Sequence, residues 1–234
     1  MQDKRKLKRL AIQGAAPATS AAVAAARATV LPDGYLDVPG GRLAAVVTYL
    51  EMNAPPDASA LETPPNPRYR MRLVPAPDLA WYRALFRAVG EQWLWFSRLQ
   101  LSDKELTAIL HDPRVGVYAL SSLRLDGQWE DQGLLELDGR IAGEVEIAFL
   151  GVAPKLIGRG AGQVMLRFAL EQAWVDGVRR VHLHTCTLDH PRALTFYLRH
   201  GFRAWKRAVE IASDPRLTGE IPFEAGAEIP LIEP

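Results

Sequence analysis

The chain has 234 residues, of which 48% are hydrophobic and 24% are charged, and its formal net charge at pH 7 is +1. This length and composition predict one globular domain with extensions. The basic residues of the first ten positions outnumber the acidic ones, so the remainder is mildly acidic and lacks the basic surface that nucleic-acid binding requires. The sequence contains no uninterrupted run of about 18 apolar residues, which argues against a membrane span. Cys186 is the only cysteine, which excludes an intrachain disulfide and favours a cytoplasmic location.

Residues 1–34 combine the basic start with an alanine-rich segment. Alanine and small polar side chains bury too little apolar area to offset the entropy of ordering the chain, so we expect a disordered leader. A targeting segment is the alternative, although Gln13, Thr19, Ser20 and Arg27 interrupt the apolar core that a signal peptide needs.

Residues 35–68 are expected to form a hairpin followed by an extended connection. Gly40-Gly41 separates two apolar runs within 35–52, which is a turn signal. Prolines then recur between 53 and 68, where they cannot donate to a sheet ladder. The extra hairpin could serve dimerisation, which makes a homodimer one expected assembly.

Residues 69–211 carry the pattern of one α/β domain, and 212–234 form a proline-containing tail without a recognisable signal. Period-two alternation and turn residues predict strands at 69–74, about 115–122, 132–138, 143–152, 180–187 and 202–211. The three strands from 115 to 152 are expected to form an antiparallel meander. Apolar spacing, caps and glycine stops predict helices over about 78–90, 93–99, 102–112, 161–175 and 191–200.

A glycine-rich loop joins the strand at 143–152 to the helix that follows. Gly158, Gly160 and Gly162 let the backbone approach a ligand closely, and the first N–H groups of the helix point at that ligand. This arrangement predicts a phosphorylated ligand. A P-loop would need Lys-Ser/Thr where Gln163-Val164 stands, and a dinucleotide fingerprint would need a further glycine that the chain lacks at the required spacing.

The loop instead resembles the acetyl-CoA loop of the GNAT superfamily of N-acetyltransferases. The matching residues are Val152-Ala153-Pro154 and Gly160-Ala161-Gly162, with Arg159 in a commonly basic position, while Ile157 replaces the usual Gln or Arg. A second family motif, Asn-x-x-Ala-x-x-x-Tyr-x-x-x-Gly-Phe, is similar to the segment 190–202, where only His190 departs from it. The two motifs identify about residues 70–211 as a member of this superfamily.

The resemblance implies an α/β fold with a mixed, mainly antiparallel sheet flanked by helices, to which this chain adds the N-terminal hairpin. It implies that the fourth and fifth strands of the domain splay apart to admit the pantetheine arm. The implied activity is transfer of the acetyl group of acetyl-CoA to a primary amine of a small molecule or peptide, by direct attack in a ternary complex and without a metal. A CoA-binding but catalytically idle interaction module is the alternative. The implied CoA contacts are Leu150, Val152, Ile157, Gly158, Arg159, Gly160, Ala161 and Gly162.

Acetyl transfer to an amine calls for a base and an acid, because a lysine-like amine with a pKa of about 10.4 must lose a proton near neutral pH. Glu144 and Glu146 lie on the same face of the strand that enters the glycine loop. The resemblance implies that Glu146 is the base or orients a water, with Glu144 as the alternative, and that Tyr197 is the acid. A solvated strand carboxylate and a core tyrosine are the structural alternatives.

The candidates for binding the acceptor amine are Trp93 and Trp95, with Glu91 and Glu144 as counter-charges. Tryptophans at such positions commonly pack in a core, whereas the same region of GNAT proteins lines the acceptor pocket. If a tryptophan faces the cleft, an aromatic or alkyl amine is the expected acceptor.

His182, His184 and Cys186 alternate along the strand at 180–187, a pattern that permits a zinc site or a Cys–His nucleophile. Ligands two residues apart on a strand are about 7 Å apart at the backbone. A packed core does not readily bring them onto one ion, so we expect no metal.

Overall fold

The structure is a computed structural model that describes residues 33–57 and 66–234. The expected leader, or targeting segment, therefore lies outside the described residues up to position 32. The section from 58 to 65 of the proline-rich connection also lies outside them. Residues Tyr35–Pro234 make up one compact unit, which is the part described below.

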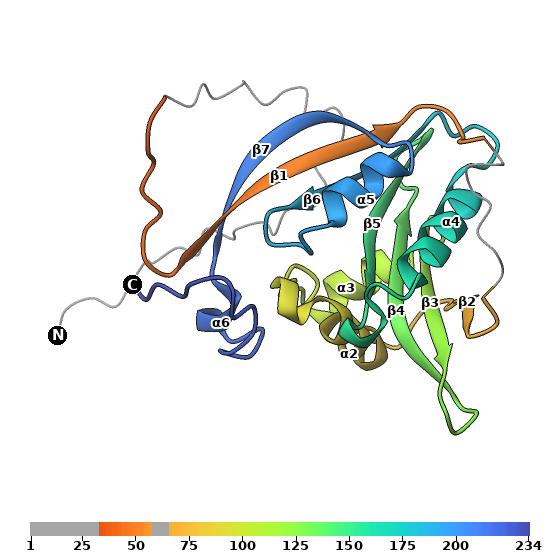
Figure 1. The fold of residues 1–234 in the computed structure, drawn as a ribbon, viewed down its shortest axis with the longest axis horizontal. Helices are drawn as coiled ribbons and strands as arrows, with labels where there is room; N and C mark the ends of the chain where they lie inside the picture. Colours follow the sequence, from red (N-terminus) through yellow and green to blue (C-terminus); the bar gives the residue numbers. More distant parts are fainter. Residues whose placement is uncertain (1–32, 58–65) are drawn as a thin grey trace. The chain divides into compact units, whose positions relative to one another are not determined.

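A seven-stranded sheet forms the centre of this unit, with strand order β2-β3-β4-β5-β6-β1-β7 (Figure 1). The strands are β1 (Arg42–Met52), β2 (Tyr69–Leu73), β3 (Val115–Leu123), β4 (Trp129–Asp138), β5 (Glu144–Val152), β6 (Arg180–Cys186) and β7 (Arg203–Ser213). Only β5 and β6 pair in parallel, and every other neighbouring pair is antiparallel. This confirms the mixed, mainly antiparallel sheet and the meander of β3, β4 and β5.

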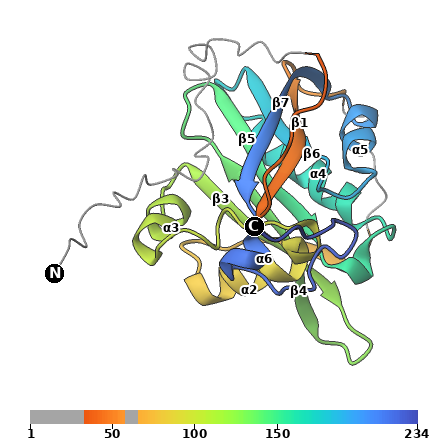
Figure 2. The same ribbon diagram turned by 90° about the vertical axis from the view of Figure 1, so that its left-hand side faces the viewer.

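Helices cover both faces of the sheet (Figures 1 and 2). They are α2 (Leu79–Gly90), η2 (Glu91–Trp93), α3 (Asp103–Leu110), η3 (Pro154–Leu156), α4 (Ala161–Ala173), α5 (Ala193–Arg199) and α6 (Pro215–Thr218). Apolar side chains of α2 and α3 pack against β3 and β4 in one core cluster. Those of α4 and α5 pack on the opposite face in a second cluster, which includes residues of β1, β5 and β6.

Local signals account for most helix ends. The side chain of Asp78 accepts a hydrogen bond from Trp81 N at the start of α2, and Ser102 with Glu105 forms the expected capping box at α3. The helix expected over 93–99 is instead the short 3-10 turn η2. Leu94 takes a left-handed backbone conformation with φ of +56°, which ends the turn.

The strand β1 lies inside the sheet, between β6 and β7 (Figure 2). Of the hairpin expected around Gly40-Gly41, the turn and the second strand are present, with Gly41 at φ of +74°, whereas residues 35–39 form no strand. β1 pairs with β6 over Val47 to Met52 and with β7 over Arg42 to Glu51. The sheet therefore draws on residues outside 69–211.

The C-terminal tail packs against the domain although its sequence carries no clear signal. Asp214 and Arg216 form a buried ion pair at 2.7 Å, and the Arg216 guanidinium also donates to main-chain carbonyls of residues 225, 226 and 229. Ile221 joins a small apolar cluster with Leu43 of β1 and with Leu94. The tail therefore packs beside the first residues of β1 and the end of η2.

Among the described residues, every helix is too short or too polar to cross a membrane.

Candidate active site

The parallel strands β5 and β6 pair over only three residues each, from Glu144–Arg180 to Glu146–His182. β5 continues to Val152 and β6 to Cys186, and no further pair between them occurs in the part of the chain that the structure describes. Opposite β4, Glu136 pairs with Phe149 and Leu137 with Ile147, so one extra residue bulges in β5 just beyond the last pair. A bulge bends its strand, and the splay expected of these two strands is present.

The glycine loop at the end of β5 has the backbone geometry of an anion site. Gly158 and Gly160 take φ values of +76° and +82°, and a Cβ added at Gly160 would meet nothing within 4 Å. α4 begins at Ala161, and no side chain caps its N-terminus among the described residues. Its first N–H groups therefore lie at open space that a phosphorylated group can fill.

The remaining predicted CoA contacts differ in exposure. Leu150 and Val152 are half-buried and pack against the core cluster, so it is their backbone at the splay that is available to a ligand. Ile157 is half-buried, Ala161 is buried, and the side chain of Arg159 is exposed. A Cβ at Gly162 would lie 3.8 Å from Phe196, so this glycine borders α5 as well as the loop.

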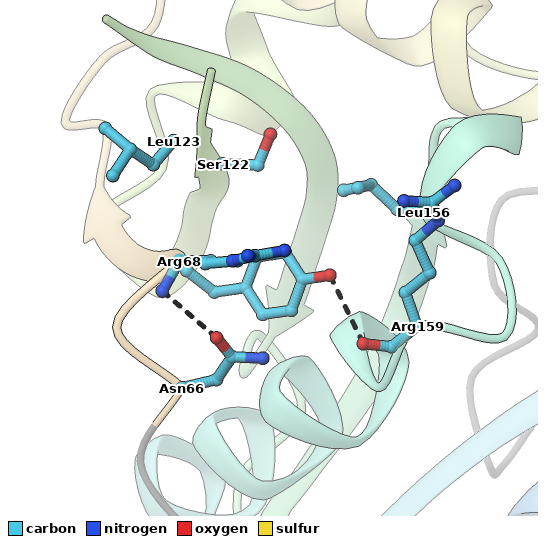
Figure 3. Close-up of a pocket in the computed structure, with 7 residues that line it drawn as sticks. Asn66, Arg68, Ser122, Leu123, Leu156 and Arg159 are labelled. Carbon is cyan, nitrogen blue, oxygen red and sulfur yellow. Dashed lines mark hydrogen bonds between the residues drawn. The ribbon is translucent and has the colours of Figure 1, made fainter. Parts of the chain in front are cut away.

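The loop is tied to β2 by a hydrogen bond that the sequence did not predict. The Tyr69 hydroxyl donates to the Arg159 carbonyl oxygen at 3.2 Å (Figure 3). A cavity of about 330 Å³ lies beside this bond, lined by Asn66, Arg68, Tyr69, Ser122, Leu123, Leu156 and Arg159. Two arginines, Arg68 and Arg159, are thus among the residues that line this cavity.

Glu144 and Glu146 share one face of β5, and the structure gives them different partners. Arg180 Nη1 lies 3.0 Å from Glu144 Oε2, and His182 Nε2 lies 3.5 Å from the same oxygen. Glu146 stands at the last β5–β6 pair, is 7% exposed, and lies 3.5 Å from His184 Nδ1. Glu144 is therefore neutralised by an arginine, whereas Glu146 faces an imidazole at the point where the strands part.

The two histidines on β6 have opposite shifts in pKa. Burial lowers the pKa of His182 and outweighs the charges of Glu146 and Glu144, which favour its protonated form. For His184, desolvation also lowers the pKa, but its interaction with Glu146 raises it more, so the pKa of His184 lies above its ordinary value.

Tyr197 lies in α5 and is 8% exposed, and its ring meets those of Phe196 and Phe202 edge-on at centroid distances of 5.3 and 5.9 Å. Burial, aided by the charge of Asp189, raises the pKa of Tyr197 well above its ordinary value, so the hydroxyl stays protonated at neutral pH. Among residues 33–57 and 66–234, no group hydrogen-bonds this hydroxyl. The Tyr197 hydroxyl therefore keeps its proton and, among the described residues, does not donate it to a hydrogen bond.

Asp189, in the loop after β6, connects β6 to Trp95, which follows η2. The sequence did not predict this role. Its Oδ2 accepts hydrogen bonds from Thr185 Oγ1 at 2.7 Å and Cys186 N at 2.8 Å, and its Oδ1 accepts one from Trp95 Nε1 at 2.9 Å. Two of the donors belong to β6, and the third, Trp95, packs against Phe149 of β5. The Asp189 carboxylate therefore connects the end of β6 to a side chain that packs on β5.

We predict that Asp189→Ala lowers the free energy of unfolding by about 1–3 kcal/mol, because it leaves partly buried donors without an acceptor. Denaturant titration measures the change, and Asp176→Ala, at an exposed turn position, is the control. Equal stability of the two variants would show that the three bonds contribute nothing.

The predicted acceptor-binding residues do not form one group. Trp95 packs between α2 and β5, with ring centroids 5.6 Å from Phe86 and 5.3 Å from Phe149. Trp93 meets the ring of His190 edge-on at 5.2 Å. Glu91 is half-buried in η2. Glu144 lies at the beginning of β5, whereas Trp95 contacts Gly151 near its end.

Tyr49 of β1 is a second residue that sequence analysis missed. It pairs with His184 across the β1–β6 ladder, and its ring centroid lies 5.8 Å from that of His184 and 6.0 Å from that of Trp205. Its position beside His184 could not be predicted, because the sequence indicated a local hairpin partner for this strand and not β6.

The alternating His182, His184 and Cys186 lie on one face of β6, as their spacing requires. Within the described ranges, no group of three His, Cys, Asp or Glu side chains is arranged to hold a metal ion. Burial and the charge of Asp189 raise the pKa of Cys186 to about 11, so its thiol is protonated at neutral pH.

Comparison with known proteins gives one family match. The model of the acetyltransferase (GNAT) family matches residues 84–202, which is half of the chain. No curated protein matches the sequence.

Solved structures are similar to the chain at low sequence identity. A functionally unknown conserved protein from Staphylococcus epidermidis has a TM-score of 0.51 and 15% identity, over 74% of this chain and 63% of its own. A GCN5-related N-acetyltransferase from Kribbella flavida has a TM-score of 0.46 and 18% identity, over 76% of this chain and 63% of its own. A putative acetyltransferase from Novosphingobium aromaticivorans has a TM-score of 0.46 and 17% identity, over 74% and 67%. The chain thus spans less than two thirds of the length of the first two.

Proposed function

The chain belongs to the GNAT acetyltransferase family, and from this membership we propose that it moves the acetyl group of acetyl-CoA to a primary amine of a small molecule or peptide. The observation that carries the proposal is the position of Glu146 at the last β5–β6 pair, on the strand that leads into the open glycine loop. One strand thereby links a phosphate-binding loop to a carboxylate beside the splay.

The residues present fit acetyl-CoA as a co-substrate. Gly158 and Gly160 keep the loop backbone open, and the uncapped start of α4 supplies N–H groups and a positive dipole end for the pyrophosphate. The backbone of β5 beyond Glu146 is free of β6 and can hydrogen-bond the amide groups of a pantetheine arm.

In the proposed mechanism the amine attacks the thioester directly, so the protein has two proton transfers to support. Glu146 supports removal of the proton from the amine, either as the base itself or by orienting the group that acts as the base. Tyr197 donates its proton to the departing thiolate, and its raised pKa keeps that proton available at neutral pH.

A two-part experiment tests the function. Titration with acetyl-CoA measures binding, and release of free thiol measures turnover with a panel of polyamines, aminoglycosides, amino acids and peptides. Turnover with one of these amines is the expected result. Binding without turnover on any amine would favour a catalytically idle CoA-binding module, and the absence of binding would exclude both functions.

The glycine loop gives a prediction for binding alone. Gly160→Asp is expected to raise the Kd for acetyl-CoA at least about tenfold, because the carboxylate enters the space beside the pyrophosphate and repels it. Aspartate tolerates a left-handed backbone better than most residues, so the variant should remain folded. Calorimetric titration measures the Kd.

Gly177→Asp is the matched control, since Gly177 has φ of +90°, is equally open, and follows the other end of α4. Its affinity for acetyl-CoA should equal that of the unmodified protein. If both variants bind alike, the glycine loop is not the pyrophosphate site.

A further inference from the structure

His184 of β6 lies beside Glu146 of β5 at the point where the two strands part. The β1–β6 ladder pairs it with Tyr49, and the tyrosine ring packs against the imidazole at a centroid distance of 5.8 Å. Its Nδ1 lies 3.5 Å from Glu146 Oε1. No hydrogen-bond partner for the other ring nitrogen, Nε2, is found in the described part of the chain.

The two side chains differ in access to solvent. The His184 side chain is 47% exposed and the Glu146 side chain 10%. An amine that arrives from solvent therefore reaches the imidazole before the carboxylate. The Glu146 carboxylate beside Nδ1 favours the tautomer that carries its proton on Nδ1, so the lone pair of Nε2 is directed away from the carboxylate.

We propose that Nε2 of His184 takes the proton from the acceptor ammonium, and that Glu146 acts through His184 as a positioning residue. This inference rests on the proposed acetyltransferase function and names the proton acceptor within it. An imidazole is better matched to the task than a carboxylate, because its ordinary pKa of about 6.5 is much closer to that of an amine than the value of about 4.3 for glutamate.

The charges around His184 favour its protonated form on balance. Carboxylates face it from three elements, with Glu146 on β5, Asp189 in the loop after β6 and Glu210 on β7. The same surface also carries His182, Cys186 and Arg180 on β6, Glu144 on β5, Tyr49 and Glu51 on β1, and Lys206 on β7. Lys206 lies over the Tyr49 ring, with its Nζ 4.8 Å from the centroid.

His182 is less suited to the same role. Its side chain is 17% exposed, and its neighbour Glu144 already pairs with Arg180 at 3.0 Å. Burial lowers its pKa, so it accepts a proton less readily than His184 does.

The proton steps balance as follows. His184 Nε2 takes one proton from the ammonium and later releases it to solvent. The neutral amine then forms the new C–N bond to the acetyl carbon and the C–S bond breaks. Tyr197 gives its proton to the sulfur and recovers the second proton of the amine nitrogen. The products are the amide, free thiol and one proton in solution.

The pair is tested first without turnover. Imidazole signals are followed by NMR across pH in the unmodified protein and in Glu146→Gln, and His184→Gln assigns the resonance. Loss of the carboxylate should lower the pKa of His184, since a neighbouring anion favours the imidazolium. The signals of His111, which contacts the Pro77 carbonyl from the end of α3, should be the same in both proteins. An unchanged pKa of His184 would overturn the pairing.

Kinetics test the proton transfer with any amine that the unmodified protein acetylates. His184→Gln should lower kcat at least about tenfold, with loss of the ascending limb of the pH profile that His184 produces. Glu146→Gln should retain that limb and move it to lower pH. His184→Gly should regain turnover when imidazole is added, and His111→Gln should behave as the unmodified protein.

The outcomes separate the two proposals. If no amine reacts, the acetyltransferase function fails and the proton role of His184 fails with it. If an amine reacts and His184→Gln keeps the rate and pH profile, His184 alone is excluded. If Glu146→Gln removes the ascending limb while His184→Gln leaves it, Glu146 is the base.

Discussion

Arg98→Met is expected to lower the free energy of unfolding by about 3–5 kcal/mol, because it leaves a buried carboxylate without its cation. Arg98 Nη2 lies 2.6 Å from Glu136 Oε1, with side chains that are 8% and 0% exposed. The Tyr82 hydroxyl donates to the other oxygen of Glu136 at 2.5 Å. Arg98 Cζ also lies 4.9 Å from the ring centre of Phe149, which follows the bulge of β5. Denaturant unfolding measures the change.

Two controls separate burial from pairing. Arg114 and Asp112 have the same N–O distance of 2.6 Å, but the Arg114 side chain is 59% exposed, so Arg114→Met should change stability little. The triple variant Arg98→Met, Glu136→Met, Tyr82→Phe removes every polar member of the buried group and should recover most of the loss. If Arg98→Met and Arg114→Met are equally stable, the buried pair contributes no more than a surface pair.

Features that depend on neighbours in the chain were predictable from the sequence. The same-face placement of Glu144 and Glu146 follows from the two-residue period of a strand, and the structure shows both on one side of β5. Gly160 lies at the start of α4, where the glycine pattern predicted a ligand loop. In each case the information lies within a few residues, which is the range over which backbone periodicity operates.

Features that depend on distant partners were not predictable. β1 reads as one arm of a local hairpin, yet its ladder partners are β6 and β7, more than a hundred residues away along the chain. Tyr49 therefore could not be placed beside His184. The same holds for Asp189, whose three donors include Trp95 from the opposite side of the splay. Long-range register is set by the whole core, not by local pattern.

Single backbone states also escaped prediction. Leu94 takes a left-handed conformation that leucine rarely adopts, and the residue is only 2% exposed. It packs with Leu43 and Ile221, so tertiary contacts offset the local strain. The expected helix over 93–99 is shortened for this reason.

Tyr197→Phe is expected to lower kcat about 100-fold, the lower end of the range for loss of a general acid or base. The Kd for acetyl-CoA should stay nearly unchanged. The phenyl ring retains the contacts with Phe196 and Phe202 at 5.3 and 5.9 Å, so only the hydroxyl is lost. Steady-state kinetics with the reactive amine, together with calorimetric titration of acetyl-CoA, measure both quantities.

Tyr118→Phe is the matched control, because Tyr118 is a half-buried tyrosine of β3 whose ring meets Phe168 edge-on at 5.1 Å. Burial raises the pKa of Tyr118, as it does that of Tyr197. The hydroxyl of each tyrosine is thus protonated. The difference is that Tyr197 lies in α5, the helix that borders Gly162, and that the charge of Asp189 contributes to its raised pKa. If a buried phenol alone mattered, the two variants would lose turnover alike. A loss confined to Tyr197→Phe assigns the proton donation to position 197, and full turnover in that variant excludes Tyr197 from the mechanism.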